Sequence, residues 1–293
     1  RHGGDITEVK LIKFPVAIET PEEPFQLLES NDRRIYVAQS GLTGLNGIDS
    51  RDGRAYFETT SKNFSLHANE DKLVAELFFS QTNGISITKR FTLRRSDYLI
   101  DVDYLIDNRS TQPWEAKFFA QIKRDSSPQP TNDQAGMGMK PFLGAATTLP
   151  DKRFEKFTFE DMADEPLQTK ISGGWIAMVQ HYFLSAWIPP SDQTHTYSTR
   201  QTTSGFNIAG LISPATIVPA GSTGEVGAKF YAGPKDQYRL LEIAPYLDLS
   251  VDYGWLWWLA QPLFWLLYKI HSFLGNWGFS IILLTILIKA AFF

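Results

Sequence analysis

The apolar C-terminal stretch, residues 255–293, limits what this chain can fold into more than any other part of it. Its only clearly ionisable residues are Lys269, His271 and Lys289. It also holds five of the chain's eight tryptophans, which are Trp255, Trp257, Trp258, Trp265 and Trp277. Tryptophan is enriched at the depth of lipid headgroups, where one ring edge is wet. We therefore expect a membrane end with these tryptophans and Lys269 at the interface. A buried hairpin of a soluble core is the alternative, but soluble helices are rarely apolar all round.

Gly275 divides this stretch into two predicted helices. Residues 277–293 would form a helix of roughly 25 Å, slightly shorter than a hydrocarbon core of about 30 Å. We therefore predict a truncated transmembrane helix in residues 276–293. Before it, Pro262 predicts a helix that starts nearby and ends at Gly275, which is too short to cross a membrane. Its polar residues fall in one turn, so residues 248–275 are predicted to form a linker and an amphipathic helix lying in the interface.

Residues 1–247 have the pattern of a β-rich domain. Asn83-Gly84 predicts a hairpin turn, because this pair tolerates positive φ. After it, apolar residues alternate with Asp101, Asp103 and Asp107, as in a strand buried on one face. Residues 175–188 are too apolar to alternate and are expected inside a sandwich, whereas 125–141 have the composition of a long surface loop. With one late helix predicted at 235–247, the pattern indicates a mainly β fold built as a large antiparallel sandwich.

Composition excludes several kinds of site. The net charge of −4 gives no basic footprint, which argues against a nucleic-acid partner. Without cysteines there are no disulfides or thiolate metal sites. The chain lacks the nucleotide-binding glycine motifs, so no cofactor is expected. The histidines have no metal-ligand spacing to one another, so no metal site is expected; they are His2, His67, His181, His195 and His271.

Two polar features of the β-rich part are interpreted as structural. Asp101, Asp103 and Asp107 could be catalytic carboxylates or calcium ligands, but alternate positions on one strand favour a solvated face. His181, in an apolar run, is interpreted as a core histidine with its hydrogen bonds satisfied. No catalytic residue is therefore predicted.

Lys289 is the unusual residue of the predicted membrane span. A lysine near the bilayer centre costs roughly 2.5–3.5 kcal/mol on insertion scales, so it suggests a function. The alternative is that its long stem reaches the far headgroups. Thr285 lies four residues earlier and so shares its helix face. Together they form a small polar stripe suited to packing against other helices or to lining a wet cavity.

Several runs resemble YidC-type membrane protein insertases of Gram-negative bacteria, and the resemblance covers nearly the whole chain. The runs are YVAQSGL at 36–42, GGWIAM at 173–178, AWIP at 186–189, APYLDL at 244–249, VDYGWLW at 251–257, IHSF at 270–273 and GNWGFS at 275–280. The resemblance implies a periplasmic β-supersandwich of the galactose-mutarotase-like kind, an amphipathic interfacial helix and the second transmembrane helix. A first span would precede Arg1, and further spans would follow Phe293.

The resemblance also implies a function. Such proteins insert and fold inner-membrane proteins, alone or with the Sec translocon and its accessory subunits, through a hydrophilic groove that carries a positive charge. Lys289 matches the position of that charge, where many members carry arginine, and Thr285 would lie in the same groove. The expected partners are client membrane proteins, the translocon and the lipid bilayer. The chain would be no enzyme and would lie in the bacterial inner membrane, with residues 1–247 in the periplasm.

Two other readings stay open at this stage. A large antiparallel sandwich is also typical of proteins that bind or act on sugars, so the chain could be a membrane-anchored carbohydrate-binding or carbohydrate-active protein. That reading requires an aromatic-lined groove with a His/Glu or Asp pair within reach of one ligand. A structural periplasmic module of a larger assembly is the third possibility.

Overall fold

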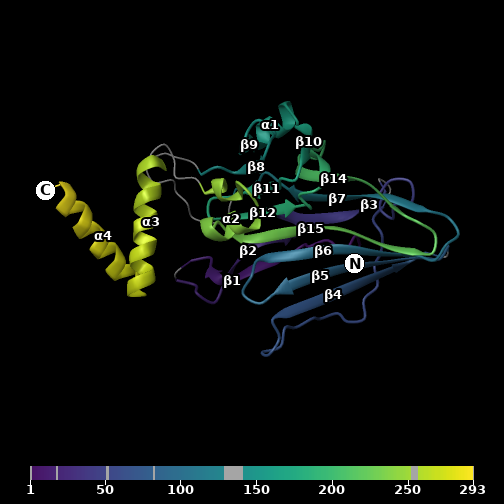
Figure 1. The fold of residues 1–293 in the computed structure, drawn as a ribbon, viewed down its shortest axis with the longest axis horizontal. Coiled ribbons are helices and arrows are strands. Elements are labelled where there is room, and N and C mark those ends of the chain that lie inside the picture. Colours follow the sequence, from purple (N-terminus) through teal and green to yellow (C-terminus); the bar gives the residue numbers. More distant parts are fainter. Residues whose placement is uncertain are drawn as a thin grey trace. The chain divides into compact units, whose positions relative to one another are not determined.

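The computed structural model of the chain describes residues 2–17, 19–50, 53–81, 83–128, 141–251 and 257–292. It separates into two compact units, Arg1–Ser250 (unit 1) and Val251–Phe293 (unit 2). Unit 1 contains two antiparallel sheets, and unit 2 contains two helices (Figure 1). The finer predicted division into 1–247, 248–275 and 276–293 stays a prediction.

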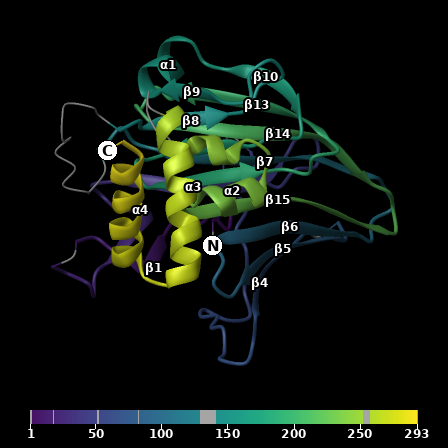
Figure 2. The ribbon, with the colours of Figure 1, turned by 60° about the vertical axis from the view of Figure 1, so that its left-hand side comes forward.

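The two sheets of unit 1 are built from strands far apart in the sequence. In both, the strand order interleaves early and late segments, as where β6 lies beside β15 in Figure 2. The seven-stranded sheet has the order β1 (Val9–Pro15), β2 (Pro24–Ser30), β3 (Ile35–Thr43), β7 (Trp114–Arg124), β14 (Asn207–Val218), β13 (Thr194–Gln201) and β10 (Gln168–Ser172). The eight-stranded sheet has the order β4 (Lys72–Ser80), β5 (Ile85–Arg94), β6 (Leu99–Asn108), β15 (Ser222–Pro234), β12 (Phe183–Ile188), β11 (Ile176–Val179), β8 (Gly144–Thr147) and β9 (Glu155–Thr158). The predicted antiparallel β sandwich is therefore confirmed.

Local sequence patterns explain the hairpin of β4 and β5 and the strand β6. The predicted turn is a loop between Ser80 and Ile85, in which Gly84 has φ +88° and its N–H donates to the Gln81 carbonyl at 3.3 Å. On β6 the apolar residues Val102, Tyr104 and Ile106 are buried, whereas Asp101, Asp103 and Asp107 on the other parity are only partly buried. Since side chains alternate along a strand, the sequence pattern alone identifies the core-facing side.

The core lies between the two sheets and is rich in aromatic side chains. The Trp187 and Phe230 rings lie 4.7 Å apart, and Trp187 Nε1 donates to the Gln121 carbonyl at 3.2 Å. Tyr36 Oη on β3 lies 2.7 Å from Ser185 Oγ on β12, so this hydrogen bond joins the sheets. The predicted interior run 175–188 forms the hairpin β11–β12, whose strand residues are all buried. These partners let the buried polar atoms enter an apolar core without a large desolvation cost.

Among the described residues of unit 1, three short helical segments accompany the sheets: α1 (Phe159–Asp164), α2 (Gln237–Ile243) and the 3₁₀ turn η2 (Leu247–Ser250). The prediction of a single helix, at 235–247, was wrong in number and in length. α1 lies in a segment with a β-like spacing of phenylalanines, but a capping box between Thr158 and Asp161 starts a helix there. At α2, the Asp236 carboxylate accepts the N–H groups of Tyr238 and Arg239 and so determines the start.

A buried ionic network ties the N-terminal segment to the sheets. Lys89 is only 1% exposed, and its Nζ donates to the carbonyls of Gly3 and Ser40 at 2.9 and 3.3 Å. Arg54 bridges Asp5 and Asp49 at 2.9 and 2.7 Å. Burial, together with the Arg54 charge, lowers the pKa of Lys89 to about 7. The network therefore connects residues 3–5 to β3 and β5 through side chains that the strand pattern alone does not pair.

Unit 2 consists of α3 (Trp257–Leu274) and α4 (Trp277–Phe292). The helix break predicted at Gly275 is confirmed. Gly275 has φ +66° and donates its N–H to the His271 carbonyl at 2.8 Å, a typical helix C-terminus. The predicted start of α3 near Pro262 was wrong, because the helix begins at Trp257 and Pro262 lies inside it. Pro262 is the sixth residue of α3, beyond the first four, whose N–H groups have no intrahelical acceptor, so it removes one hydrogen bond, the one that would run to the Trp258 carbonyl.

In the part of the chain that the structure describes, no helix is both long enough and apolar enough to cross a membrane. The transmembrane assignment of residues 276–293 therefore stays a prediction.

Candidate functional site

The predicted interface residues of α3 are partly described. Trp258 and Trp265 are 58% and 54% exposed. Lys269 is exposed and its Nζ lies 5.9 Å from the centroid of the Trp265 ring, in the geometry of a cation–π contact. Trp255 lies outside the described residues, as does the side chain of Trp257. The structure thus brings Lys269 and Trp265 together on one helix face, four residues apart.

The turn between α3 and α4 places Trp277 against a histidine. The Trp277 and His271 rings stack with centroids 3.7 Å apart, and Trp277 is 46% exposed. Asn276 caps α4, because its Oδ1 accepts the Phe279 N–H at 3.2 Å. The predicted interface tryptophan therefore belongs to an ordered helix–turn–helix corner.

Lys289 and Thr285, the two predicted groove residues, share a face of α4 and are both exposed. The Thr285 hydroxyl donates to the Ile281 carbonyl one turn earlier, at 2.7 Å. This bond satisfies the hydroxyl within its own helix, which lowers the cost of an apolar surrounding. The stripe therefore offers one cation beside one internally satisfied hydroxyl.

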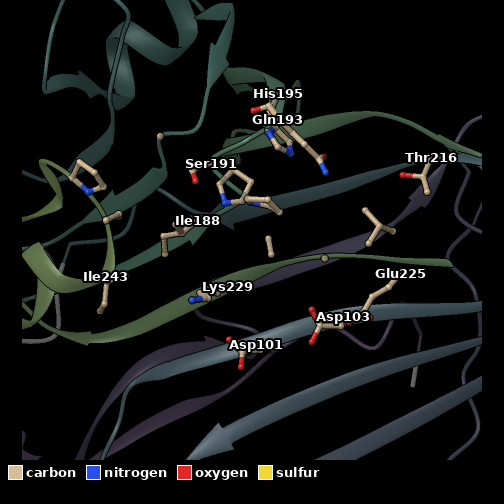
Figure 3. A pocket seen from close by; sticks show the side chains of 18 of the residues that line it. Asp101, Asp103, Ile188, Ser191, Gln193, His195, Thr216, Glu225, Lys229 and Ile243 are labelled. Carbon is tan, nitrogen blue, oxygen red and sulfur yellow. Dashed lines mark hydrogen bonds between the residues drawn. The ribbon is translucent and has the colours of Figure 1, made fainter.

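Unit 1 contains a groove of about 870 Å³ that the sequence did not predict. Its lining comes from β6, β15, the segment that joins β12 to β13, and the end of α2. Figure 3 shows Asp101 and Asp103 from β6 at the bottom of the view, Glu225 and Lys229 from β15 above them, and Gln193 and His195 at the top. None of the described residues that line it is Phe, Tyr or Trp.

The strand register explains how the acidic side of the groove is built. Lys229 pairs with Asp101 across the ladder, and Gly227 pairs with Asp103. A Cβ atom at Gly227 would lie 2.6 Å from Asp103 Oδ1, so the glycine leaves the room that this carboxylate occupies. Burial, Glu225 and Asp101 raise the pKa of Asp103 to about 6. The carboxyl group of Asp103 therefore changes charge just below neutral pH.

The two aspartates that flank Asp103 along β6 have basic partners. Asp101 forms an ion pair with Arg94 at 2.6 Å, and Asp107 with Arg109 at 2.8 Å. The prediction of a polar strand face is confirmed for these two. In the described residues, no group of three or more His, Asp or Glu side chains could hold a metal ion.

His195 lies on the opposite side of the groove from the carboxylates. It is buried, at 1% exposure, and its Nδ1 lies 3.2 Å from the Gln193 carbonyl. Burial lowers the pKa of its imidazole. By contrast, the predicted core residue His181 is only half-buried and stacks on Tyr182 at a turn, so that prediction was wrong. The sequence signal that could have identified His195 instead is its position two residues before Tyr197, which puts both on the same face of the strand.

Comparison with known families identifies residues 1–266 as a match to the YidC periplasmic domain. The chain is 48% identical over 292 residues to a membrane protein insertase YidC from Cellvibrio japonicus, covering 99% of this chain and 52% of that protein. It is 47% identical over 291 residues to one from Pseudomonas entomophila, covering 99% of this chain and 52% of that protein. The chain thus spans about half the length of the curated relatives it matches.

Solved structures with a similar arrangement of strands include sugar-related proteins. A galactose mutarotase related enzyme from Lactobacillus acidophilus has a TM-score of 0.47 and 10% identity, covering 79% of this chain and 92% of its own. A galactose mutarotase-like protein from Lactobacillus casei has a TM-score of 0.46 and 10% identity, covering 80% and 94%.

Proposed function

This chain belongs to the YidC family of membrane protein insertases, and from this premise we propose that it forms the periplasmic domain and the adjoining membrane segment of such an insertase. In this proposal the full-length protein inserts and folds inner-membrane proteins, alone or with the Sec translocon and its accessory subunits. Unit 1 lies in the periplasm, α3 lies in the interface and α4 begins the second membrane span. The protein acts on its clients without catalysing a reaction and without a cofactor.

The observation that carries the proposal is the position of Lys289 on α4. The helix is apolar along most of its length, and Ile282 and Ile286 are 57% and 56% exposed. An exposed apolar helix in a soluble environment is unfavourable, and lipid removes that cost. A single lysine on such a helix costs roughly 2.5–3.5 kcal/mol in the hydrocarbon centre, which favours a polar groove rather than lipid around it.

The proposed groove lowers the barrier to moving a polar segment into the bilayer. A short polar or acidic part of a client loses its hydration on entering lipid, at a cost of several kcal/mol. The Lys289 ammonium offsets part of this cost by attracting negative charge in a region of low dielectric constant. The apolar part of the client then partitions into lipid by itself. Arginine would supply the same charge with two-pronged hydrogen bonding, which lysine lacks.

The features of α3 support an interfacial position. Trp258, Trp265 and the Lys269 cation combine aromatic rings with a charge that can reach water, a composition found at headgroup depth. At the corner, Trp277 is half-exposed and stacked on His271. These side chains would hold the turn between α3 and α4 at the membrane surface, where α4 enters the bilayer.

The test replaces Lys289 in the full-length protein. We expect Lys289→Ala to reduce insertion of a client that does not use the translocon about tenfold, which corresponds to roughly 1.4 kcal/mol of lost attraction. Lys289→Arg should retain insertion because it keeps the charge. Lys269→Ala, which removes a lysine from α3 instead, is the matched control and should change insertion less. Equal activity of the Ala and Arg variants at position 289 would refute the proposed role of the charge.

The groove of unit 1 supports a second candidate function, binding of a carbohydrate. It places His195 and the carboxylates of Asp103 and Glu225 around one cavity. However, sugar sites usually include an aromatic platform, and the described lining contains no Phe, Tyr or Trp. A glycan binding screen with unit 2 intact distinguishes the two functions. A glycan that binds the natural chain saturably and binds the Asp103→Asn variant more weakly would favour this candidate.

A further inference from the structure

Five large side chains remain exposed at the end of unit 1 from which the chain leaves for α3. We call them the exit patch: Tyr182, Tyr238, Leu241, Tyr246 and Leu249, which are 52%, 38%, 57%, 40% and 42% exposed. They lie on the β11–β12 turn, α2 and the segment that runs into η2. Exposed apolar side chains that gather in one place mark an interaction surface.

The backbone around the exit patch holds these side chains in fixed positions. The Lys235 N–H, just before α2, donates to the Tyr182 carbonyl at 2.9 Å and joins the β11–β12 turn to α2. On α2, Leu240 is the buried residue, so Tyr238 and Leu241, three residues apart, share the outer face. The buried indole of Trp175 donates to the Pro245 carbonyl at 3.0 Å and fixes the segment before Tyr246. Hydrogen bonds within unit 1 therefore hold the backbone of the patch.

Tyr246 has a backbone conformation that its side chain does not favour. Its φ is +68°, in the left-handed region that residues with a bulky side chain rarely adopt. Its ring lies 5.4 Å below the Arg153 guanidinium, and the ring is nevertheless 40% exposed. Glycine or asparagine would adopt this φ with less strain. Strained residues of this kind concentrate at functional sites, which makes the Tyr246 ring a candidate contact residue.

The charges beside the exit patch are largely compensated. Arg239 forms ion pairs with Asp97 at 2.6 Å and with Glu242 at 3.0 Å. The Lys235 ammonium donates to the Ser250 carbonyl at 3.0 Å. The charge of Arg239 is therefore neutralised by two carboxylates, and the apolar and aromatic side chains of the patch supply its contacts with a partner.

We propose that the exit patch docks into the headgroup region of the lipid bilayer. This inference rests on the proposed membrane location of unit 2. Three of the five side chains are tyrosines, whose apolar ring and polar tip suit the interface. Its last two residues, Tyr246 and Leu249, come shortly before α3 in the sequence. A bilayer that holds α3 therefore keeps this end of unit 1 within the reach of the connecting residues 251–256, roughly 20 Å. Docking would fix the end of unit 1 at the membrane surface, whereas without docking only residues 251–256 would connect it to α3.

The test uses the absence of cysteines from the chain. Three single-cysteine variants of the whole chain carry an environment-sensitive fluorophore: Leu241→Cys, Ile217→Cys and Ile286→Cys. Each labelled variant is reconstituted into phosphatidylcholine vesicles. Nitroxide lipids then quench at headgroup depth or deep in the acyl chains. Ile217 is the matched control, because it is 62% exposed against 57% for Leu241. Ile217 lies near the end of β14, beside the Ser222 end of β15, whereas α2 follows the Pro234 end of β15. The two ends of β15 are about 40 Å apart along the strand.

We expect headgroup nitroxides to quench the label at position 241, deep nitroxides to quench the label at 286, and neither to quench the label at 217. Quenching at 286 without quenching at 241 would overturn the docking inference and leave the proposed function standing. Quenching at neither 286 nor 241 would overturn the proposed membrane location itself. Equal quenching at 217 and 241 would show that unit 1 meets the bilayer without a preferred face, which also contradicts the inference.

A second variant separates docking from folding. Tyr246→Gly relieves the backbone strain and removes the ring, so unit 1 should fold at least as well. We expect headgroup quenching of the label at 241 to fall, with the ratio of docked to undocked molecules reduced roughly fivefold by the loss of one aromatic contact. Ile217→Ser should leave it unchanged. Quenching that persists in Tyr246→Gly, or that disappears in 1 M salt, would contradict docking through apolar contacts.

Discussion

The two units of the chain use tryptophan in opposite ways. In unit 1, Trp175 and Trp187 are at most 1% exposed, and each indole N–H donates to a backbone carbonyl. In unit 2, Trp258 and Trp265 are more than half exposed. The same side chain therefore completes a closed core in one unit and an open apolar surface in the other. Unit 1 derives its stability from within, whereas unit 2 depends on what surrounds it.

The contrast extends to charged residues. Unit 1 buries Lys89 and surrounds it with carbonyl oxygens and carboxylates. Unit 2 carries Lys289 on an exposed apolar helix face. A buried charge in a closed core has its partners supplied by the fold, while a charge on an open apolar face requires a partner from outside. This difference supports a structural role for the first lysine and the proposed client-binding role for the second.

The largest expected effect tests the difference between the tryptophans of the two units. Trp187→Ala should destabilise unit 1 by about 3–5 kcal/mol, because it removes a buried ring and leaves a cavity. Trp265→Ala, the same change on α3, should leave the unfolding of unit 1 unchanged. Denaturant unfolding of the chain in mild detergent, followed by the β signal in far-ultraviolet circular dichroism, measures both. A similar shift of the midpoint in the two variants would show that the units are not independent.

The buried network gives a smaller, asymmetric effect. Arg54→Met should cost about 3 kcal/mol, since it removes the direct ion pairs of Asp5 and Asp49. Lys89→Met should stay within about 1 kcal/mol of the natural chain, because it removes a costly buried charge together with its hydrogen bonds.

The pKa of Lys89 is lowered to about 7, so the folded protein releases this proton at a lower pH than the unfolded chain does, and its stability should rise from pH 7 toward pH 10. Lys89→Met should lose this rise. Equal destabilisation by the two variants would contradict the assignment of Arg54 as the essential cation.

The smallest expected effect concerns the groove of unit 1. The pKa of Asp103 is raised to about 6, so the folded protein binds this proton more tightly than the unfolded chain. Its favourable contribution is complete below the ordinary pKa of the carboxyl and is lost as the pH rises through 6. Asp103→Asn should therefore be more stable than the natural chain by about 1 kcal/mol at pH 7, because partial solvation of the carboxyl group keeps the effect small. Near pH 3 the variant and the natural chain should be equally stable. Thermal unfolding at the two pH values checks this, and an identical difference at both would exclude titration of Asp103 as the cause.

Features encoded over short distances were predictable. The alternation on β6 identified its buried face, and Gly275 identified the break between α3 and α4. Thr158 and Asp161 carried a recognisable capping box, and the β-like spacing of nearby phenylalanines hid it. Lys89 lies on the same parity as Ile85 and Ile87, so its burial could also have been read from the strand pattern.

The groove could not be predicted in the same way. Asp103 and Glu225 lie together because β6 pairs with β15, and His195 lines the same groove from β13, a strand of the other sheet. Nothing in the local sequence of any one of them records the identity of its neighbours. The exit patch is similar, because Tyr182 and Leu241 come from elements that the pairing of β12 with the end of β15 brings together.

The sequence by itself determined the β-rich class of unit 1, the apolar character of the last two helices, the place where they separate and the position of Lys289. Each of these follows from periodicity, composition or a single turn residue. Only the tertiary structure decided which strands became neighbours, and through them the buried Lys89 network, the acidic groove and the exposed exit patch. These features depend on contacts between residues distant in the chain, whose pairing is determined by the packing of the whole core rather than by local preference.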